Sequence, residues 1–124
     1  SPLRQLPDLL QHDLIGNDTD PSILRGFQAL GYPVSREAFV LRTDDFIVQW
    51  QAVRAGLGIG FLADYMARSD PDVRPVLAGA LPIPALPMWL AVHREIRTNP
   101  RIRAVYDLLA EALPLALAPR VTAN

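Results

Sequence analysis

The sequence predicts an α/β fold in which short buried strands alternate with amphipathic helices. Two segments each combine a brief apolar strand with a following helix of about ten residues, and a glycine, Gly31 or Gly56, ends each helix. This order of strand, helix and strand favours parallel strands joined by right-handed crossovers. We therefore expect a central, mostly parallel sheet flanked by helices.

The first strand–helix unit begins with a helical turn over residues 7–12 and a brief strand at Leu14 and Ile15. The polar segment NDTDP (residues 17–21) provides helix-capping side chains and a proline for the first turn, and it predicts a helix that runs to Leu30. The apolar residues on one face of this helix are Ile23, Leu24, Phe27 and Leu30.

The second unit begins with a strand at residues 39–41 and continues with a helix over residues 46–55. The apolar residues that predict the buried face of this helix are Phe46, Trp50 and Val53. Gly56 ends the helix, and residues 58–62 form the next strand.

A short helix at residues 64–68 leads to a run without formal charge from Pro75 to His93. A run of this length raises the possibility of a membrane span, but its prolines would break any helix through it: Pro75, Pro82, Pro84 and Pro87. We instead expect a proline-rich crossing segment followed by one buried strand at residues 88–92.

A last amphipathic helix is predicted over residues 100–113, with Asn99 as its cap and Pro114 as its end. It carries an apolar stripe, but no obvious later strand follows to which the chain could return. The stripe must therefore cover either this sheet or another domain.

The composition excludes several classes of protein. The net charge is −1 and all twelve basic residues are arginine, so no overall field draws the chain toward nucleic acid or an anionic membrane. The absence of cysteine removes disulfides, thiolate catalysis and cysteine-bound zinc. The first residues lack the features of a signal peptide, so we expect a cytoplasmic protein.

Polar side chains follow the first two predicted strands, at the edge where small ligands bind in open α/β sheets. Asn17 and Asp18 follow the first strand, and Thr43, Asp44 and Asp45 follow the second. The functional interpretation is that they bind a small-molecule effector, with the aspartates selecting donor or cationic groups. The alternative, which stays open, is that they only cap the helices.

Two further residues, His93 and Arg94, end the strand expected at residues 88–92. They either contact the effector or simply form a polar strand end. Both interpretations stay open.

The glycines and the tryptophan of the second unit are interpreted as structural residues. Gly56, Gly58 and Gly60 follow a helix and enter a strand, whereas a phosphate-binding loop needs glycines between a strand and the next helix. We expect them to stop the helix and to allow close backbone packing. Trp50 is expected in the core.

No pattern indicates an enzyme or a bound cofactor. The serines lie outside any nucleophile-elbow motif, and the two histidines are far apart in the sequence without cysteine. We predict no catalytic residue, no metal site and no cofactor. The arginines near residues 94–103 are interspersed with acidic residues and are interpreted as a solvated face.

Three motifs in order resemble the C-terminal half of the effector-binding region of LysR-type transcriptional regulators. They are PDLLQHDLIG, then RTDD with QAVRAGLGIGFL, and last PMWLAVHREIRTNPRIRAVYDLLAEAL. The resemblance implies a fold like the type 2 periplasmic binding proteins, in which two α/β subdomains close around a small molecule. One departure is Ala63, where the family usually has proline.

This resemblance implies three parts. Residues 1–94 would be the second regulatory, effector-binding subdomain. Residues 95–113 would be a C-terminal helix packing on a first subdomain missing from this chain, or on a partner. Residues 114–124 would be a flexible tail.

The function expected from this resemblance is the sensing of a small metabolite. The effector would control a helix-turn-helix DNA-binding domain that this chain does not contain. The protein would form homo-oligomers and would not bind membranes. One alternative is a fragment of a solute-binding protein of the same fold. Another is a dimerisation or interaction fragment that binds no ligand.

Overall fold

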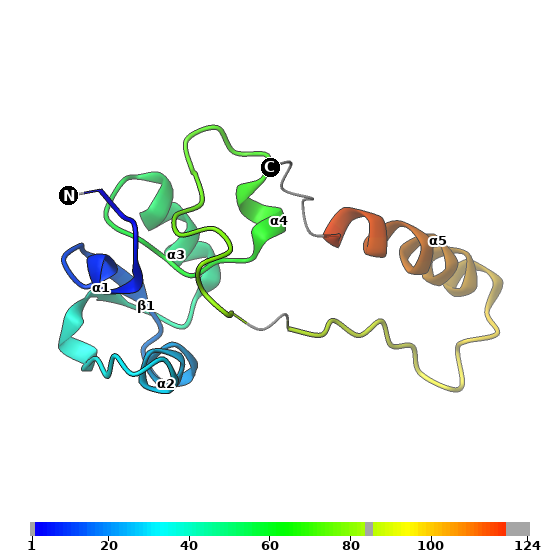
Figure 1. The fold of residues 1–124 in the computed structure, drawn as a ribbon. Coiled ribbons are helices and arrows are strands. Elements are labelled where there is room, and N and C mark those ends of the chain that lie inside the picture. Colours follow the sequence, from blue (N-terminus) through cyan, green and yellow to red (C-terminus); the bar gives the residue numbers. More distant parts are fainter. Residues whose placement is uncertain (1, 84–85, 119–124) are drawn as a thin grey trace. The chain divides into compact units, whose positions relative to one another are not determined.

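The structure is a computed structural model, and it describes residues 2–83 and 86–118 (Figure 1). Contacts between residues divide the chain into two compact units, Ser1–Ile83 and Pro84–Asn124. The elements described in the first unit are α1 (Leu6–Leu9), β1 (Leu14–Gly16), α2 (Ser22–Ala29), the 3₁₀ turn η1 (Arg36–Ala38), β2 (Phe39–Arg42), α3 (Phe46–Arg54) and α4 (Asp64–Ala67). The second unit contains α5 (Pro100–Leu117).

The sheet is parallel, as the order of strands and helices predicts. β1 pairs with β2, with Leu14 opposite Phe39 and Gly16 opposite Arg42. The register shifts by one residue between Leu14 and Ile15. On its other edge, β1 forms a single parallel bridge from Leu14 to Ile59. β1 therefore lies between β2 and the segment that contains Ile59.

The sheet is smaller than expected, because the strand predicted at residues 58–62 is reduced to that one bridge. Gly58 and Gly60 alternate with Ile59, and glycine is unfavourable in strand interiors because it has no side chain to pack. A Cβ on Gly58 would meet the carbonyl oxygen of Asp13, so the two segments approach too closely for any larger residue.

Helices contact both faces of this small sheet. Successive strand residues point to opposite faces, and Leu14 packs with Leu9, Phe27 and Phe39 from α1, α2 and β2. On the other face, a Cβ on Gly60 would lie 2.6 Å from Cγ2 of Val53 in α3 and 3.9 Å from Cβ of Ile15. Leu14 and Ile15 are both fully buried.

The chain reverses after α3 through Gly56, whose φ angle is 78°. This left-handed conformation is accessible to glycine without a steric penalty. It ends the helix one residue after its C-cap, Ala55, and sends the chain back toward β1.

The predicted buried face of α3 is wrong at Phe46, whose side chain is 60% exposed. The structure instead buries Gln49 completely. The side of α3 that meets the sheet includes Gln49 and Val53, which lie one helical turn apart, and Phe46 at the start of the helix falls outside it.

The buried strand predicted at residues 88–92 is also wrong. These residues have no strand partner in the part of the chain that the structure describes, and the Trp89 side chain is 86% exposed. The apolar run resembles a strand in composition, but a strand forms only beside a neighbouring backbone that accepts its hydrogen bonds.

The last helix extends further than predicted. Asn99 caps α5 by accepting hydrogen bonds from the backbone N–H groups of Arg101 (3.0 Å) and Ile102 (3.5 Å), as expected. The predicted end at Pro114 is wrong, since α5 continues to Leu117. Pro114 cannot donate to the carbonyl one turn earlier, but the helix is exposed there and water can hydrate that carbonyl. Residues 119–124 of the predicted tail lie outside the described residues.

Candidate functional site

Two loops meet at the carboxyl ends of β1 and β2, and we call them together the strand-end site. The first loop, residues 17–20, connects β1 to α2, and the second, residues 43–45, connects β2 to α3. Because the strands are parallel, both loops begin at the same edge of the sheet. The backbone N–H of Thr43 donates to the carbonyl of Gly16 at 3.0 Å, so the pairing continues up to the start of the second loop.

The carboxylate of Asp44 joins the two loops. It accepts hydrogen bonds from the backbone N–H groups of Asp18 (3.0 Å), Thr19 (3.1 and 3.2 Å) and Asp20 (3.3 Å). The Thr19 hydroxyl donates to the same carboxylate at 2.5 Å. These donors, the Thr19 hydroxyl first, hold the pKa of Asp44 below its usual range. Asp44 therefore stays ionised and holds the first loop in place.

The buried side chain of Gln49 makes a second link between the loops. Its Nε2 group donates to the carbonyl of Thr43 at 2.5 Å and to Oδ1 of Asn17 at 2.8 Å, and it lies 3.5 Å from the carbonyl of Gly16. An oxygen in this position would face three other oxygens, which fixes the orientation of the amide. The other amide atom, Oε1, is buried without a hydrogen-bond partner in the described chain.

Asp45 acts as the cap of α3. Its carboxylate accepts hydrogen bonds from the backbone N–H groups of Ile47 (2.9 Å) and Val48 (3.2 Å). The hydroxyl oxygen of Thr43 accepts from the backbone N–H of Asp45 at 3.2 Å. This geometry favours the capping interpretation for Asp45 and leaves the Thr43 hydroxyl able to donate.

The other acidic residues of the first loop also have partners. Asp18 forms an ion pair with Arg36 of η1, at 2.6 Å between Oδ1 and Nη2, although both side chains are about half exposed. Asp20 accepts from the backbone N–H of Ser22 at 2.9 Å and from the Ser22 hydroxyl. These bonds, the hydroxyl first, lower the pKa of Asp20.

After these internal bonds, the strand-end site retains mainly hydrogen-bond donors. The Thr43 hydroxyl proton and the Asn17 Nδ2 group have no acceptor among the described residues, and both side chains are half-buried. The carboxylates of Asp44 and Asp45 are occupied by N–H groups of the chain itself. The site can therefore offer donors to a ligand more readily than acceptors.

His93 and Arg94 do not belong to the unit that contains the strand-end site. Both belong to the second unit and are exposed. Nδ1 of His93 accepts a hydrogen bond from the backbone N–H of Glu95 at 3.1 Å, which closes a local turn. Their role in binding stays a prediction.

Sequence reasoning missed Gln49 and Arg36 at this site. Gln49 was overlooked because the apolar residues around it set the predicted face of the helix. The available signal was that Gln49, a polar residue, lies one turn before Val53 on the side of the helix that faces the sheet. The strand ends there leave carbonyl groups that need a donor. Arg36 lies in η1, which no sequence pattern predicted.

The described parts of the chain contain neither a metal-binding cluster nor a membrane-spanning helix. Residues 2–83 and 86–118 contain no group of three or more histidine, aspartate or glutamate side chains placed to hold a metal ion. Nor does any helix within those residues have the length and apolar character needed to cross a membrane.

Comparison with known proteins identifies one family. The sequence model of the LysR substrate binding domain matches residues 1–114. No curated protein and no solved structure matches the chain.

Proposed function

This chain belongs to the LysR substrate-binding domain family, and on that premise we propose that it is the effector-sensing module of a LysR-type transcriptional regulator. In this proposal a small metabolite binds at the strand-end site, which forms one wall of a cleft in a domain like the type 2 periplasmic binding proteins. The bound state is passed to a separate helix-turn-helix DNA-binding domain, and the regulator acts in the cytoplasm. The module binds its effector without chemical reaction.

The observation that carries the proposal is the pair of free donors at the strand-end site. Asp44 and Gln49 both hydrogen-bond across the two loops. The hydroxyl of Thr43 and the amide of Asn17 are therefore held in position before any ligand binds. Preorganised donors favour binding because little conformational entropy is lost when the ligand arrives. A scaffold that only needed helix caps would not require two loops tied together.

The free donors of the strand-end site also suggest which chemical groups the effector carries. The aspartates were predicted to select cationic or donor groups, but their oxygens are already occupied by backbone N–H groups. We propose instead that the effector presents an acceptor, a carbonyl or carboxylate oxygen, to Thr43 and Asn17. The pair of Asp18 with Arg36 reduces the repulsion that a carboxylate would meet there.

Thermal unfolding of the 124-residue chain with a small panel of compounds tests this proposal. The panel contains acetamide, succinate and benzoate as acceptors, and methylammonium as a donor-only cation. At least one acceptor should raise Tm, by about 4 °C for each kcal/mol of binding free energy, while methylammonium should not act through this site. The Thr43→Val variant should bind the active compound about fivefold more weakly, since one hydrogen bond is lost.

Two further variants complete this experiment. Thr43→Ser keeps the hydroxyl and should restore binding, whereas Thr98→Val alters an exposed threonine in the second unit and should change nothing. Equal binding by Thr43→Val and the unaltered chain would show that the hydroxyl does not contact the ligand.

We also propose that the chain forms homo-oligomers through α5. In the described part of the second unit no side chain is buried, and Leu108 (64%) and Leu115 (77%) of α5 are largely exposed. A second copy could cover these exposed leucines, which lie beside the predicted apolar stripe. Light scattering after size exclusion should give at least twice the monomer mass, and Leu108→Glu should return the monomer. A monomeric parent chain would contradict this proposal.

The two alternatives from the sequence make different predictions. A solute-binding protein fragment would share the fold, but the family match supports the regulator. An interaction fragment would oligomerise and show no thermal shift with any member of the panel.

A further inference from the structure

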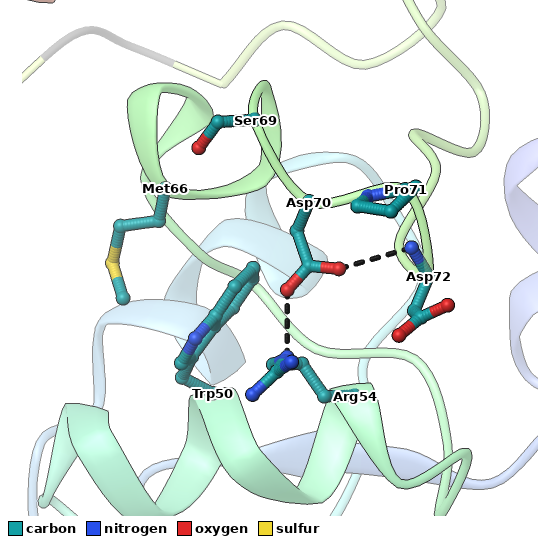
Figure 2. A pocket seen from close by; sticks show the side chains of 7 residues that line it. All are labelled: Trp50, Arg54, Met66, Ser69, Asp70, Pro71 and Asp72. Carbon is teal, nitrogen blue, oxygen red and sulfur yellow. Dashed lines mark hydrogen bonds and ion pairs between the residues drawn. The ribbon is translucent and has the colours of Figure 1, made fainter.

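A surface pocket of about 530 Å³ lies between α3, α4 and the loop that follows α4, apart from the residues of the strand-end site. Figure 2 shows Trp50 and Arg54 rising from α3, with Asp70 above them and Met66 on the other side of the indole ring. The remaining lining residues come from the loop: Ser69, Pro71 and Asp72. The wall therefore combines an aromatic ring, a thioether and several charged groups.

Asp70 organises this pocket. Its Oδ2 atom pairs with Nε of Arg54 at 2.6 Å, and its Oδ1 atom accepts a hydrogen bond from the backbone N–H of Asp72 at 2.9 Å (Figure 2). The Asp70 side chain is only 13% exposed, so water screens this pair less than an ordinary surface pair. Arg54 is therefore already neutralised by a close partner.

The carboxylate of Asp72 remains without an ion-pair or hydrogen-bond partner within the described chain. With Arg54 paired to Asp70, the three charged groups of the pocket leave one net negative charge. Trp50 is half-buried and forms part of the wall. Both the negative face of an indole ring and an unpaired carboxylate attract cations.

From this combination we propose that the pocket is a second binding site, which takes a small organic cation of the alkylammonium or guanidinium class. The cation lies against the Trp50 ring on its Met66 side, and the Asp72 carboxylate, beyond the Arg54–Asp70 pair, gives the pocket the net negative charge that attracts it (Figure 2). The thioether of Met66 adds a polarisable apolar contact beside the ring. An anion is disfavoured, because its only counter-charge, Arg54, is held by Asp70.

Choline tests this proposal, because it has an uncharged analogue of the same shape, 3,3-dimethyl-1-butanol. The chain carries two tryptophans, so a Trp89→Phe variant leaves Trp50 as the single tryptophan, whose emission can be excited apart from that of the tyrosines. Choline should change the Trp50 emission in a saturable way and bind at least about tenfold more tightly than the alcohol. Asp72→Asn should weaken choline binding about three- to fivefold.

A matched control is Glu111→Gln, which removes the same charge from an exposed position of α5 and should leave choline binding unchanged. A readout that does not depend on fluorescence is the broadening of the choline methyl signal in proton NMR, which Trp50→Leu should abolish. Should Trp50→Leu fail to fold by circular dichroism, Trp50→Phe retains a ring with a weaker cation attraction and should bind choline less tightly.

Three results would overturn the proposal. Equal binding of choline and the alcohol would mean that the pocket recognises apolar surface rather than charge. Saturable binding of acetate in place of choline would mean that Arg54 is available to anions. The absence of any saturable signal would mean that the pocket binds no small cation.

Discussion

Replacing Gln49 tests the link between the two loops most severely, because the side chain is fully buried and its amide donates to acceptors from both. Gln49→Glu keeps the size and shape of the side chain but puts an oxygen where Nε2 now donates. The ionised carboxylate would then face the carbonyl of Thr43 and the Oδ1 atom of Asn17. The contacts that Gln49 makes with the described residues include no cationic group that could neutralise it.

The size of the effect follows from these contacts. Two short hydrogen bonds are lost, each contributing about 1 kcal/mol net. A buried charge without a partner adds a larger penalty, so the total destabilisation near neutral pH should be about 3 kcal/mol or more. Gln49→Met loses the same two bonds but introduces no charge and also removes the unpaired Oε1 atom, so it should lose only about 1–2 kcal/mol.

The pH dependence separates charge from packing. Burial among oxygens raises the pKa of a glutamate at this position in the folded state, so the folded variant binds its proton more tightly than the unfolded chain. The Gln49→Glu variant should therefore regain stability relative to the parent as the pH falls from about 7 to about 5. Gln49→Met should show no such recovery.

Urea unfolding followed by circular dichroism measures these free energies. The control is Gln51→Glu, which makes the same change at an exposed position of α3 and should stay within about 0.5 kcal/mol of the parent. A Gln49→Glu variant as stable as Gln51→Glu near neutral pH would refute the claim that a buried amide ties the loops together.

The remaining predictions concern single interactions, each measured against the unaltered chain. The pKa of Asp44 is lowered in the folded state, so the stability that its carboxylate contributes is present above the unfolded pKa of 3.8 and is lost as the pH falls through the folded pKa. The Asp44→Asn variant should therefore lose less stability on acidification than the parent. An acid profile identical to that of the parent would argue against this. Asp45→Ala removes the cap of α3 and should cost about 1 kcal/mol in urea unfolding, whereas a neutral effect would mean that the cap is dispensable. Gly58→Ala forces a methyl group against the Asp13 carbonyl and should cost about 1–3 kcal/mol, with full stability contradicting the close approach. Pro114→Ala restores a backbone donor inside α5 and should increase the helical signal at 222 nm, while an unchanged spectrum would mean that the helix already ends there.

Local sequence patterns predicted most helices and their ends. Glycine stops, capping side chains and helical spacing depend on neighbouring residues only, and these signals correctly predicted α2, α3 and the Asn99 cap of α5. The same reasoning predicted the parallel pairing of β1 with β2, because a crossover helix of this length leaves few other arrangements.

The errors arose where an element depends on a distant partner. Residues 88–92 have the composition of a buried strand, but a strand also needs a neighbour to accept its hydrogen bonds, and no local pattern shows whether one is present. The buried face of α3 was predicted from apolar spacing alone. That spacing could not reveal that Gln49 is buried because carbonyl groups at the strand ends need a donor.

The proximity of the two loops was predicted, whereas their hydrogen bonds were not. Polar residues after two parallel strands were expected at one edge of the sheet, and the structure places both loops there, since that follows from topology. The hydrogen-bond partners of Asp44 lie on the opposite loop, and its partner Thr19 is more than twenty residues away in the sequence. The sequence therefore could not show that the aspartates bind the chain itself and leave Thr43 and Asn17 as the free donors.

The central claim is that an effector with an acceptor group binds at the strand-end site. The most direct measurement is an NMR titration of the ¹⁵N-labelled chain with whichever compound of the acetamide, succinate and benzoate panel gives the largest thermal shift. The account predicts saturable shifts of the backbone amides of residues 17–20 and 43–46, and their loss in Thr43→Val. Shifts confined to residues 50–72, or shifts at the strand-end site that persist undiminished in Thr43→Val, would contradict it.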